Sequence, residues 1–334
     1  MSNANTPFYR LDPDTILHAL ESMGLHPDGR LLALNSYENR VYQVGIEDGL
    51  PLVVKFYRPA RWSDAAIQEE HAFLQALASA EIPVVAPIEF SHNTLHTYNQ
   101  ADASFRFAVF PRQGGRAPEL DRPEHLEWMG RFIGRIHAIG MLETFKHRPS
   151  LSIACFGEEP GQYLLEQGFI PADLQEVYRG VLAQALEGVK RCFDRAGQVQ
   201  NLRLHGDCHL GNVLWTDTGP HFVDFDDSRM GPAIQDIWML LSGERDTQTM
   251  QLNDFLAGYE CFCEFNPRET HLIEALRTLR LIHYSAWLAK RWEDPAFPFA
   301  FPWFNTQRYW QDRILELREQ VALMDEMPIH VGQP

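Results

Sequence analysis

The stretch Leu204–Asn212, with the sequence Leu-His-Gly-Asp-Cys-His-Leu-Gly-Asn, decides how this chain folds, together with Asp224 further along. Asp207 and Asn212 stand five residues apart in a glycine-containing loop, and Asp224 follows the apolar run 221–223. Aspartate, asparagine and glycine are common in ordinary turns, so this pair alone would carry little information. The combination of His-Gly-Asp, an amide five residues later and a carboxylate after the next apolar run indicates a functional site.

The chemistry that suits these three side chains is the transfer of a phosphoryl group from ATP. The carboxylate of Asp207 can accept the proton of a hydroxyl, while Asn212 and Asp224 can bind magnesium beside the phosphates. Magnesium prefers oxygen ligands, so Asp and Asn suit it better than His or Cys. The sequence therefore predicts a kinase that depends on ATP and Mg2+, with Asp207 and Asp224 as catalytic residues and Asn212 and Asp224 as metal ligands.

The composition is that of a globular chain long enough for two lobes, with 334 residues, 45% of them hydrophobic and 22% charged. The net charge of −16 disfavours nucleic acid and anionic membranes as partners. The five cysteines include no C-x-x-C pair, which fits a reducing compartment. No signal peptide and no apolar run of the ~20 residues that span a bilayer are evident. We therefore expect a cytoplasmic enzyme that does not bind membranes.

Hydrophobic periodicity predicts an α+β chain with a small sheet-containing lobe followed by a larger, mainly helical lobe. The change falls at Pro111–Pro118, a stretch rich in Gly and Pro that suits a hinge. We expect an N-terminal nucleotide-binding lobe at 1–112 and a C-terminal helical catalytic lobe at 113–334. The expected strands are 30–35, 41–46, 51–57, 87–91, 94–98 and 105–110; the expected helices are 12–24, 63–80, 123–140, 172–196, 232–243, 247–263, 267–292 and 306–326.

Lys55 is the candidate that would hold the ATP phosphates. It lies in the apolar strand 52–57, where an unpaired charge is costly, although a lysine pointing to solvent from an edge strand would look similar. On the helix predicted at 63–80, Glu70 falls at the centre of the apolar stripe and Glu69 beside it. A carboxylate on a buried face requires a cationic partner. We therefore predict an ion pair between Lys55 and Glu70 rather than two solvated glutamates.

Two further segments are candidates for nucleotide contacts. The turn Leu34–Tyr42 lies where a phosphate-covering loop belongs, and Ser36 and Asn39 can offer donors to phosphate oxygens, although an ordinary polar turn would look the same. At the start of the hinge, Val109 and Phe110 are expected to contact adenine through backbone groups and apolar walls.

These motifs resemble a known family. His205–Asn212 with Asp224 resembles the aminoglycoside phosphotransferase/choline kinase branch of the bilobal protein-kinase-like fold. Residues 34–42, 53–59, 204–212, 231–241 and 294–303 together resemble the stress response kinase A family, over about residues 8–326. The resemblance implies a cytoplasmic, monomeric bacterial serine/threonine protein kinase that acts in envelope and oxidative stress. It also implies that Ser36 contacts ATP and that the acceptor is a protein, the kinase itself included.

The chain departs from ordinary protein kinases at Gly206, which replaces the arginine of H-R-D, and at Asp226, which stands where D-F-G has glycine. Asp226 could approach a second metal ion or serve as a structural carboxylate. Asp236 is expected to brace the catalytic loop through backbone hydrogen bonds. Cys208 could act as an oxidation sensor, but a small buried side chain is the more common role, since reactivity requires a lowered pKa.

The acceptor is less well defined than the reaction. A small hydroxyl compound of the choline, homoserine or aminoglycoside type is the alternative to a protein, because the same catalytic residues serve both. A nucleotide-binding module without catalysis is disfavoured, because Lys55, Asp207, Asn212 and Asp224 are all present.

Overall fold

The computed structural model describes residues 7–100 and 103–332, which form two compact units. Of the described residues, unit 1 comprises 7–100, 103–118, 145–148 and 211–227, and unit 2 comprises 119–144, 149–210 and 228–332. The main division thus falls at Pro118, close to the expected boundary after residue 112. It differs in assigning residues 145–148 and 211–227 to the unit that contains the sheet. Among the described residues, no helix combines the length and apolar character needed to cross a membrane.

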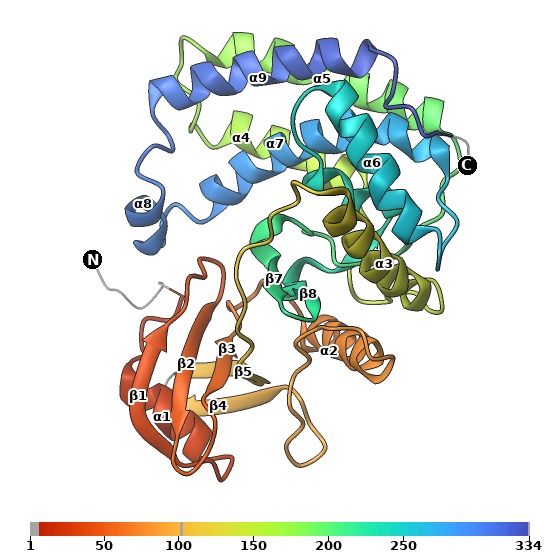
Figure 1. Cartoon of the computed structure of the whole chain (residues 1–334). Coiled ribbons are helices and arrows are strands. Elements are labelled where there is room, and N and C mark those ends of the chain that lie inside the picture. The colour runs from red at the N-terminus through yellow and green to blue at the C-terminus, as the bar shows by residue number, and fades with distance from the viewer. Residues whose placement is uncertain (1–6, 101–102, 333–334) are drawn as a thin grey trace. The chain divides into compact units, whose positions relative to one another are not determined.

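Unit 1 is built on a five-stranded antiparallel sheet with the strand order β1-β2-β3-β5-β4 (Figure 1). Side chains alternate between the two faces of a strand. On β3, Val54 and Phe56 belong to the core that the sheet forms with α1, while Lys55 is directed to the opposite face. The strands are β1 (Pro27–Ala33), β2 (Arg40–Ile46), β3 (Leu52–Phe56), β4 (His96–Gln100) and β5 (Ala103–Pro111).

Two helices of unit 1 follow from clear capping signals. Asp12 caps α1 (Pro13–Glu21) by accepting a hydrogen bond from the Thr15 amide, and Pro13 fits the first turn. Ser63 caps α2 (Asp64–Ser79) in the same way, by accepting from the Ala66 amide. Both helices lie within a few residues of their predicted limits.

A short hairpin completes unit 1, formed by β7 (Val213–Thr216) and β8 (Gly219–Phe222). It is tied to the rest of the unit by backbone hydrogen bonds, because Arg116 pairs with Trp215 in both directions and the Phe222 amide donates to Pro83 O. These bonds explain why a segment more than 90 residues beyond Pro118 belongs to the sheet-containing unit.

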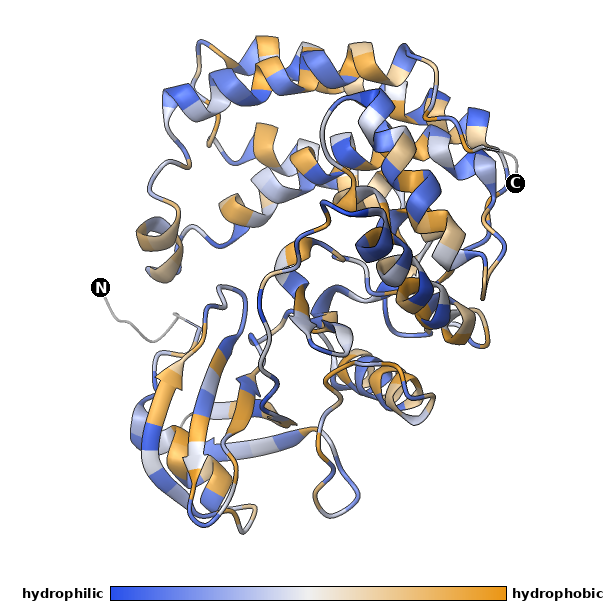
Figure 2. Ribbon diagram, in the orientation of Figure 1, coloured by the Kyte–Doolittle hydropathy of each residue, from blue (hydrophilic) through white to orange (hydrophobic). Residues whose placement is uncertain are grey.

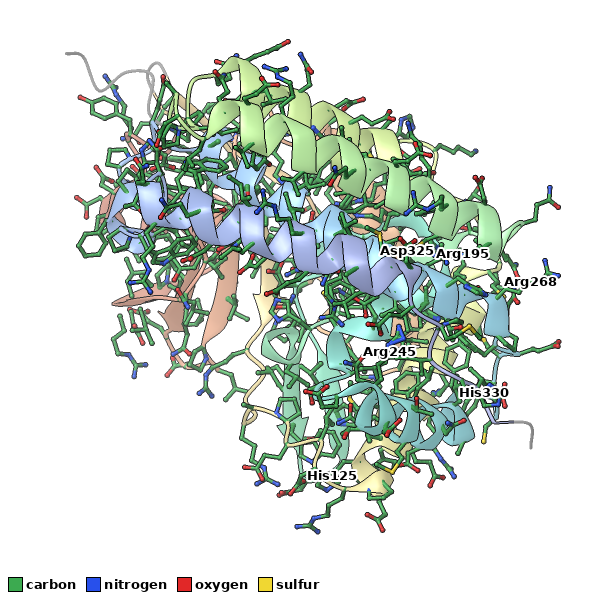
Figure 3. All side chains as sticks on the ribbon, turned by 90° about the horizontal axis from the view of Figure 1, so that it is seen from above. His125, Arg195, Arg245, Arg268, Asp325 and His330 are labelled. Atoms are coloured by element: carbon green, nitrogen blue, oxygen red, sulfur yellow. The ribbon has the colours of Figure 1, made fainter. Side chains whose placement is uncertain are left out.

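Unit 2 is mainly helical, and amphipathic helices enclose its core (Figure 2). Its long helices α5 and α9 are joined near their C-terminal ends, where Arg191 pairs with Asp325 at 2.9 Å and Arg195 donates to Met324 O (Figure 3). The α-helices are α3 (Pro123–Gly140), α4 (Glu159–Glu166), α5 (Gln175–Ala196), α6 (Arg245–Tyr259), α7 (Ile273–Lys290), α8 (Ala296–Ala300) and α9 (Gln307–Asp325). The π-helical turn η2 (Ala154–Glu158) precedes α4, and strand β6 (Leu202–Leu204) pairs with β9 (Arg229–Gly231).

Two of the expected elements do not form, the first six residues of the helix expected at 267–292 are a 3-10 turn, and the helices α4 and α8 were not expected. No strand forms at 87–91, because Pro87 lacks a backbone donor and the chain turns at Ser91 and His92, both with positive φ. The helix expected at 232–243 is two 3-10 turns, η5 (Ala233–Asp236) and η6 (Trp238–Leu240). Further 3-10 turns lie at η3 (Leu210–Asn212), η4 (Phe225–Asp227) and η7 (Pro267–Leu272).

Candidate active site

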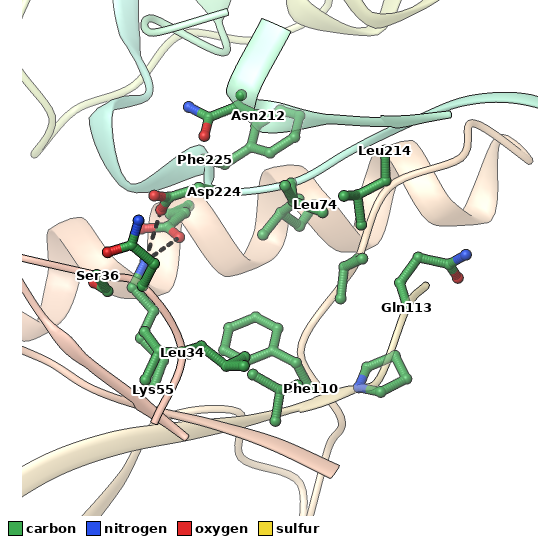
Figure 4. A pocket seen from close by; sticks show the side chains of 18 residues that line it. Leu34, Ser36, Lys55, Leu74, Phe110, Gln113, Asn212, Leu214, Asp224 and Phe225 are labelled. Carbon is green, nitrogen blue, oxygen red and sulfur yellow. Dashed lines mark hydrogen bonds and ion pairs between the residues drawn. The ribbon is translucent and has the colours of Figure 1, made fainter. Parts of the chain in front are cut away.

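A pocket in unit 1 gathers most of the predicted nucleotide and metal residues (Figure 4). Its volume is about 290 Å³, and it has an apolar end and a charged end. The apolar end includes Leu34, Val53, Phe110 and Leu214, whereas Lys55, Glu70, Asn212 and Asp224 form the charged end. Ligand pockets commonly combine apolar walls with a few convergent polar groups.

Lys55 is almost completely buried, with 7% of its surface exposed, at the charged end of this pocket. Its ammonium lies 2.9 Å from Asp226, 3.4 Å from Asp224 and 3.8 Å from Glu70. Burial acts to lower the pKa of Lys55, but the surrounding carboxylates outweigh it, and the pKa is raised well above its ordinary value. The lysine therefore remains a fixed positive charge inside the pocket.

The predicted ion pair between Lys55 and Glu70 is present, but Glu70 has a closer cationic partner. Arg148 donates to Glu70 Oε2 at 2.8 Å and also to Ala66 O and Asp226 O. The Arg148 side chain is completely buried. The neighbouring Glu69 is not part of the pocket; it accepts hydrogen bonds from the backbone amides of residues 146–148.

Asp226 is a structural carboxylate in this geometry. It is 4% exposed and lies between Lys55 and Arg61, with both of which it forms ion pairs. Burial acts to raise the pKa of Asp226, and the charges of Arg61 and Lys55 lower it to about 2. Of the two roles open to Asp226, the described contacts favour a structural one over a second metal site.

Asn212 and Asp224 flank the open end of the β7–β8 hairpin. Val213 pairs with Phe222, and the Val223 amide donates to Asn212 O at 3.0 Å, which brings residue 224 beside residue 212. Asp224 has a φ of +60°, in the left-handed region that non-glycine residues seldom adopt. Such strained backbone is concentrated at functional sites. Here it accompanies a side chain that is 56% exposed.

The oxygen atoms of Asn212 and Asp224 fit a magnesium ion that is also bound by a nucleotide. Magnesium is usually held by one or two protein carboxylates together with substrate phosphates and water. Among the residues the structure describes, no group of three or more His, Cys, Asp or Glu side chains could hold a metal by itself. The donor set therefore suits a metal that arrives with ATP rather than a permanent structural ion.

The turn 34–42 places one of its two predicted residues at the pocket. Ser36 lines it and donates its hydroxyl to Asn39 O at 3.3 Å. Asn39 does not line the pocket: its side chain is buried and accepts the Arg58 amide at 3.0 Å. In this structure the Asn39 side chain therefore stabilises the turn.

At the hinge, Phe110 lines the pocket, whereas Val109 does not. The alternation of side chains along β5 directs Val109 into the core on the other face of the sheet, where it is fully buried. Its carbonyl oxygen already accepts the Ile88 amide at 2.7 Å. The chain just beyond, at Pro111 and Gln113, contributes to the pocket instead.

Asp207 belongs to unit 2, in a loop whose backbone is hydrogen-bonded to the side chain of Asp236. The carboxylate of Asp236 accepts the backbone amides of His205 and Gly206, each at 2.8 Å, which confirms the predicted bracing role. His137 extends this support, because it contacts Asp236 at 3.2 Å. His205 accepts the Asp207 amide at 3.3 Å, so it positions the loop.

The Asp207 carboxylate has a guanidinium group on one side and an imidazole ring on the other. Arg280 forms an ion pair with one carboxylate oxygen, and His209 Nε2 lies 3.5 Å from the other. Burial acts to raise the pKa of Asp207, but His209 and Arg280 outweigh it, so the pKa lies well below its ordinary value. Next to it, Cys208 is 1% exposed and burial raises the pKa of its thiol, which favours the role of a buried side chain over that of an oxidation sensor.

Three cationic residues of these sites were not predicted from the sequence, namely Arg61, Arg148 and Arg280. Each pairs with a predicted acidic residue that is distant in the chain, at separations of 165, 78 and 73 residues. The sequence offered one indication of such a partner, namely that a buried Glu70 needs a cation. Lys55 is nearer to Glu70 in the sequence than Arg148 and was therefore chosen.

Comparison with solved structures defines the fold class. Amicoumacin kinase hAmiN, solved in complex with AMP-PNP, Ca2+ and Ami, superposes with a TM-score of 0.72 at 20% identity, covering 95% of each chain. This likeness shows that the present chain has the kinase-like α+β fold, as predicted.

Sequence comparison then identifies the family. The model of the phosphotransferase enzyme family (APH) matches residues 30–273. Stress response kinase A of Escherichia coli strain K12 is 44% identical over 331 residues, 99% of each chain. The serine/threonine protein kinase RdoA of Salmonella typhimurium is 44% identical over 324 residues, 97% of each chain. The chain therefore belongs to the phosphotransferase enzyme family, and within it to the stress response kinase A family.

Proposed function

We propose that this kinase transfers the γ-phosphoryl group of ATP to serine or threonine hydroxyls of proteins, in a magnesium-dependent reaction of the bacterial stress response. The observation that carries the proposal is the convergence of Lys55, Asn212 and Asp224 in a pocket that also has apolar walls. Consistent with this, the related fold of hAmiN was solved with the ATP analogue AMP-PNP.

In this pocket the apolar walls suit adenine, and Lys55 suits the phosphates. The lysine is held in place by Asp226 and Glu70, so its orientation costs little when ATP binds. Asn212 and Asp224 would hold Mg2+ against the phosphates, where the ion neutralises charge that develops during transfer. Ser36 would contribute a hydroxyl near the phosphates.

The acceptor hydroxyl would be aligned by Asp207. As its oxygen bonds to the γ-phosphorus, the bond from phosphorus to the bridging oxygen breaks, ADP leaves, and Asp207 takes the hydroxyl proton. Asp207 and Asn212 stand five positions apart, a separation that can span at most ~18 Å, so the chain itself keeps the proposed proton acceptor close to the proposed metal ligand.

The protein acceptor is supported by the relative RdoA, which is named a serine/threonine protein kinase. The alternative is a small-molecule acceptor, supported by the fold shared with amicoumacin kinase. We further infer a cytoplasmic monomer, with the kinase itself among its acceptors. These inferences rest on the family.

The test is transfer of label from [γ-32P]ATP with Mg2+, offered separately to the enzyme alone, to casein, and to choline, homoserine and an aminoglycoside. The proposal expects labelled protein, with little labelled metabolite. Label confined to a metabolite would establish the alternative, and no transfer at all would leave only nucleotide binding and contradict both.

A further inference from the structure

Arg280 touches the carboxylate that the proposed reaction uses as its base. It lies in the middle of α7, and its Nη1 forms an ion pair with Asp207 Oδ1. The Arg280 side chain is 40% exposed and that of Asp207 is 24% exposed, so solvent and an incoming acceptor can reach both. Within residues 7–100 and 103–332, Asp207 is the one acidic partner of Arg280.

The pair has a chemical consequence for the base. A carboxylate that is held by a guanidinium is a weak proton acceptor, and the pKa of Asp207 is indeed depressed, with burial opposed by His209 and Arg280. General bases work best when their pKa lies near the working pH. A group that draws Arg280 away would therefore raise the pKa of Asp207 and improve it as a base.

The positive charge of Arg280 also favours an anionic group of the acceptor over a cationic group at this position. A guanidinium presents five N–H donors in a planar fork that matches a carboxylate, and the printed contact with Asp207 involves one nitrogen. An ammonium group placed beside Arg280 would be repelled. The overall charge of the chain is −16, so Arg280 is a local positive charge on a chain that is negative as a whole.

The same face of α7 continues into an aromatic surface. Tyr284 and Trp287 follow Arg280 by four and seven residues, so all three lie along one side of the helix. The two rings stack with centroids 5.6 Å apart and planes 15° apart, and both side chains are half-buried. Trp287 also packs against Phe297 and Phe301, so only the part of the Tyr284–Trp287 pair that stays exposed could contact an apolar side chain of a polypeptide.

We propose that Arg280 selects the acceptor of the reaction, which is a serine or threonine in a polypeptide segment that carries a neighbouring Asp or Glu. The acidic side chain exchanges with Asp207 as the partner of Arg280, and this exchange frees Asp207 to accept the hydroxyl proton. The inference rests on the proposed function, because it assigns Asp207 as the base and a protein as the acceptor. It names the substrate class for that same site.

The experiment compares three peptides that share one serine and differ only in the flanking residues, which are Asp/Glu, Ala or Lys. Phosphorylation is measured as kcat and KM with wild type, Arg280→Gln and Arg280→Glu. We expect wild type to favour the acidic peptide over the basic one by about tenfold or more in kcat/KM, with kcat contributing to the difference. Such a ratio corresponds to ~1.4 kcal/mol.

The variants separate selection from a merely structural role. Arg280→Gln should abolish the preference between peptides, and Arg280→Glu should shift it toward the basic peptide. Lys290→Gln on the same helix removes the same charge from an exposed side chain that lies over Tyr163, so it should keep the wild-type preference. Thermal unfolding of each variant shows whether the fold is retained.

The outcomes distinguish the inference from the function on which it rests. Equal use of the three peptides by wild type, or an unchanged preference in a folded Arg280→Gln, would overturn the role of Arg280 and leave the protein kinase activity standing. Absence of transfer to every peptide, with transfer to a metabolite, would overturn both.

Discussion

At the scale of single residues, the candidate nucleotide pocket is notable for the buried charges that its side chains compensate. Lys55, Arg61 and Arg148 neutralise Glu70 and Asp226, and all five side chains are at most 12% exposed. Burying a charge without a partner costs several kcal/mol. Asp224 differs because it is 56% exposed, which leaves its oxygen atoms accessible to a metal ion.

The contact between Arg148 and Glu70 leads to a stability prediction. Replacing Arg148 by Met removes the closest partner of a buried carboxylate, and breaking such a pair costs ~3–5 kcal/mol. Urea unfolding should therefore show a loss of that order. Lys146→Met, in the same loop but with an exposed side chain, should unfold like wild type. A fully stable Arg148→Met would mean that Lys55 alone satisfies Glu70.

Asp224 leads to a prediction about magnesium. Asp224→Asn removes a charged ligand, so the affinity for ATP should fall by about tenfold or more in Mg2+, ~1.4 kcal/mol, and change much less in EDTA. Calorimetric titration in both buffers measures this. Asp217→Asn, in the exposed turn of the same hairpin, is the control. An equal loss of affinity in both buffers would contradict metal binding by Asp224.

The sequence predicted the acidic and amide residues of the sites better than their partners. Asp207, Asn212 and Asp224 could be found because they lie in one motif with fixed spacing. Val109 and Asn39 do not line the pocket, because the face of a strand and the inward turn of a loop residue depend on register and packing, which the sequence does not show. Arg148 and Arg280 could not be found, since contacts over 78 and 73 residues leave no local pattern.

At the scale of elements, α3 and α6 approach so closely that glycine is required at the crossing. A Cβ built on Gly130 would lie 1.9 Å from Phe255 O, and one on Gly258 would lie 1.9 Å from Glu127 O. Neither contact can be relieved by a side-chain rotation, because both neighbours are backbone atoms. The two helices must separate if either residue acquires a side chain.

We therefore expect Gly130→Ala to destabilise the protein by ~1–3 kcal/mol or more, as overpacking does. Gly180→Ala, at an exposed helical position with nothing within 4 Å of its Cβ, should instead stabilise it by ~0.5–1 kcal/mol, because alanine loses less entropy on folding. Chemical denaturation of the two variants should thus give shifts of opposite sign. Shifts of the same sign would contradict the crossing described here.

The turn η5 connects a buried glutamate to the catalytic loop. Glu269 Oε2 accepts the Ile234 amide at 2.9 Å, and Asp236, at the other end of η5, holds His205 and Gly206. Burial raises the pKa of Glu269 to about 7, although hydrogen bonds from the backbone amides of 233 and 234 oppose the rise. The carboxylic acid form is thus favoured in the folded protein.

This shift predicts how stability depends on pH. The folded pKa of about 7 lies above the ordinary value of 4.5, so the folded state binds more protons between these values. The contribution of Glu269 is fully present below pH 4.5 and is lost as the pH rises through 7, by an amount of order ~3 kcal/mol. Glu269→Gln should lack this pH-dependent contribution to the free energy of unfolding. In urea unfolding, the stability of the variant relative to wild type should therefore increase from pH 5 to pH 8. A constant difference would contradict the raised pKa.

Elements were predictable where local signals agreed with packing. The caps at Asp12 and Ser63 fixed the starts of α1 and α2. The segment 232–243 has helical periodicity but forms 3-10 turns, in which the amides of Ile237 and Leu240 donate to carbonyl groups three residues back.

At the scale of the whole molecule, each compact unit is built from several stretches that are separate in the sequence. The β7–β8 hairpin carries Asn212 and Asp224 into unit 1, while Asp207, five residues before Asn212, belongs to unit 2. Hydrophobic periodicity marked the one point where a sheet-containing stretch gives way to a helical one. It could not show that a later segment, 211–227, packs in the first unit. The motif that contains Asp207 and Asn212 thus begins in unit 2 and ends in unit 1.

In the proposed reaction Asp207 accepts the hydroxyl proton, while the residues of unit 1 bind the nucleotide. The most direct measurement is the rate of phosphoryl transfer from saturating ATP and Mg2+ to an acidic serine peptide by Asp207→Asn. We predict a rate lower by ~10²–10⁴-fold, as for loss of a general base, with ATP affinity close to that of wild type. A near-wild-type rate would contradict the account.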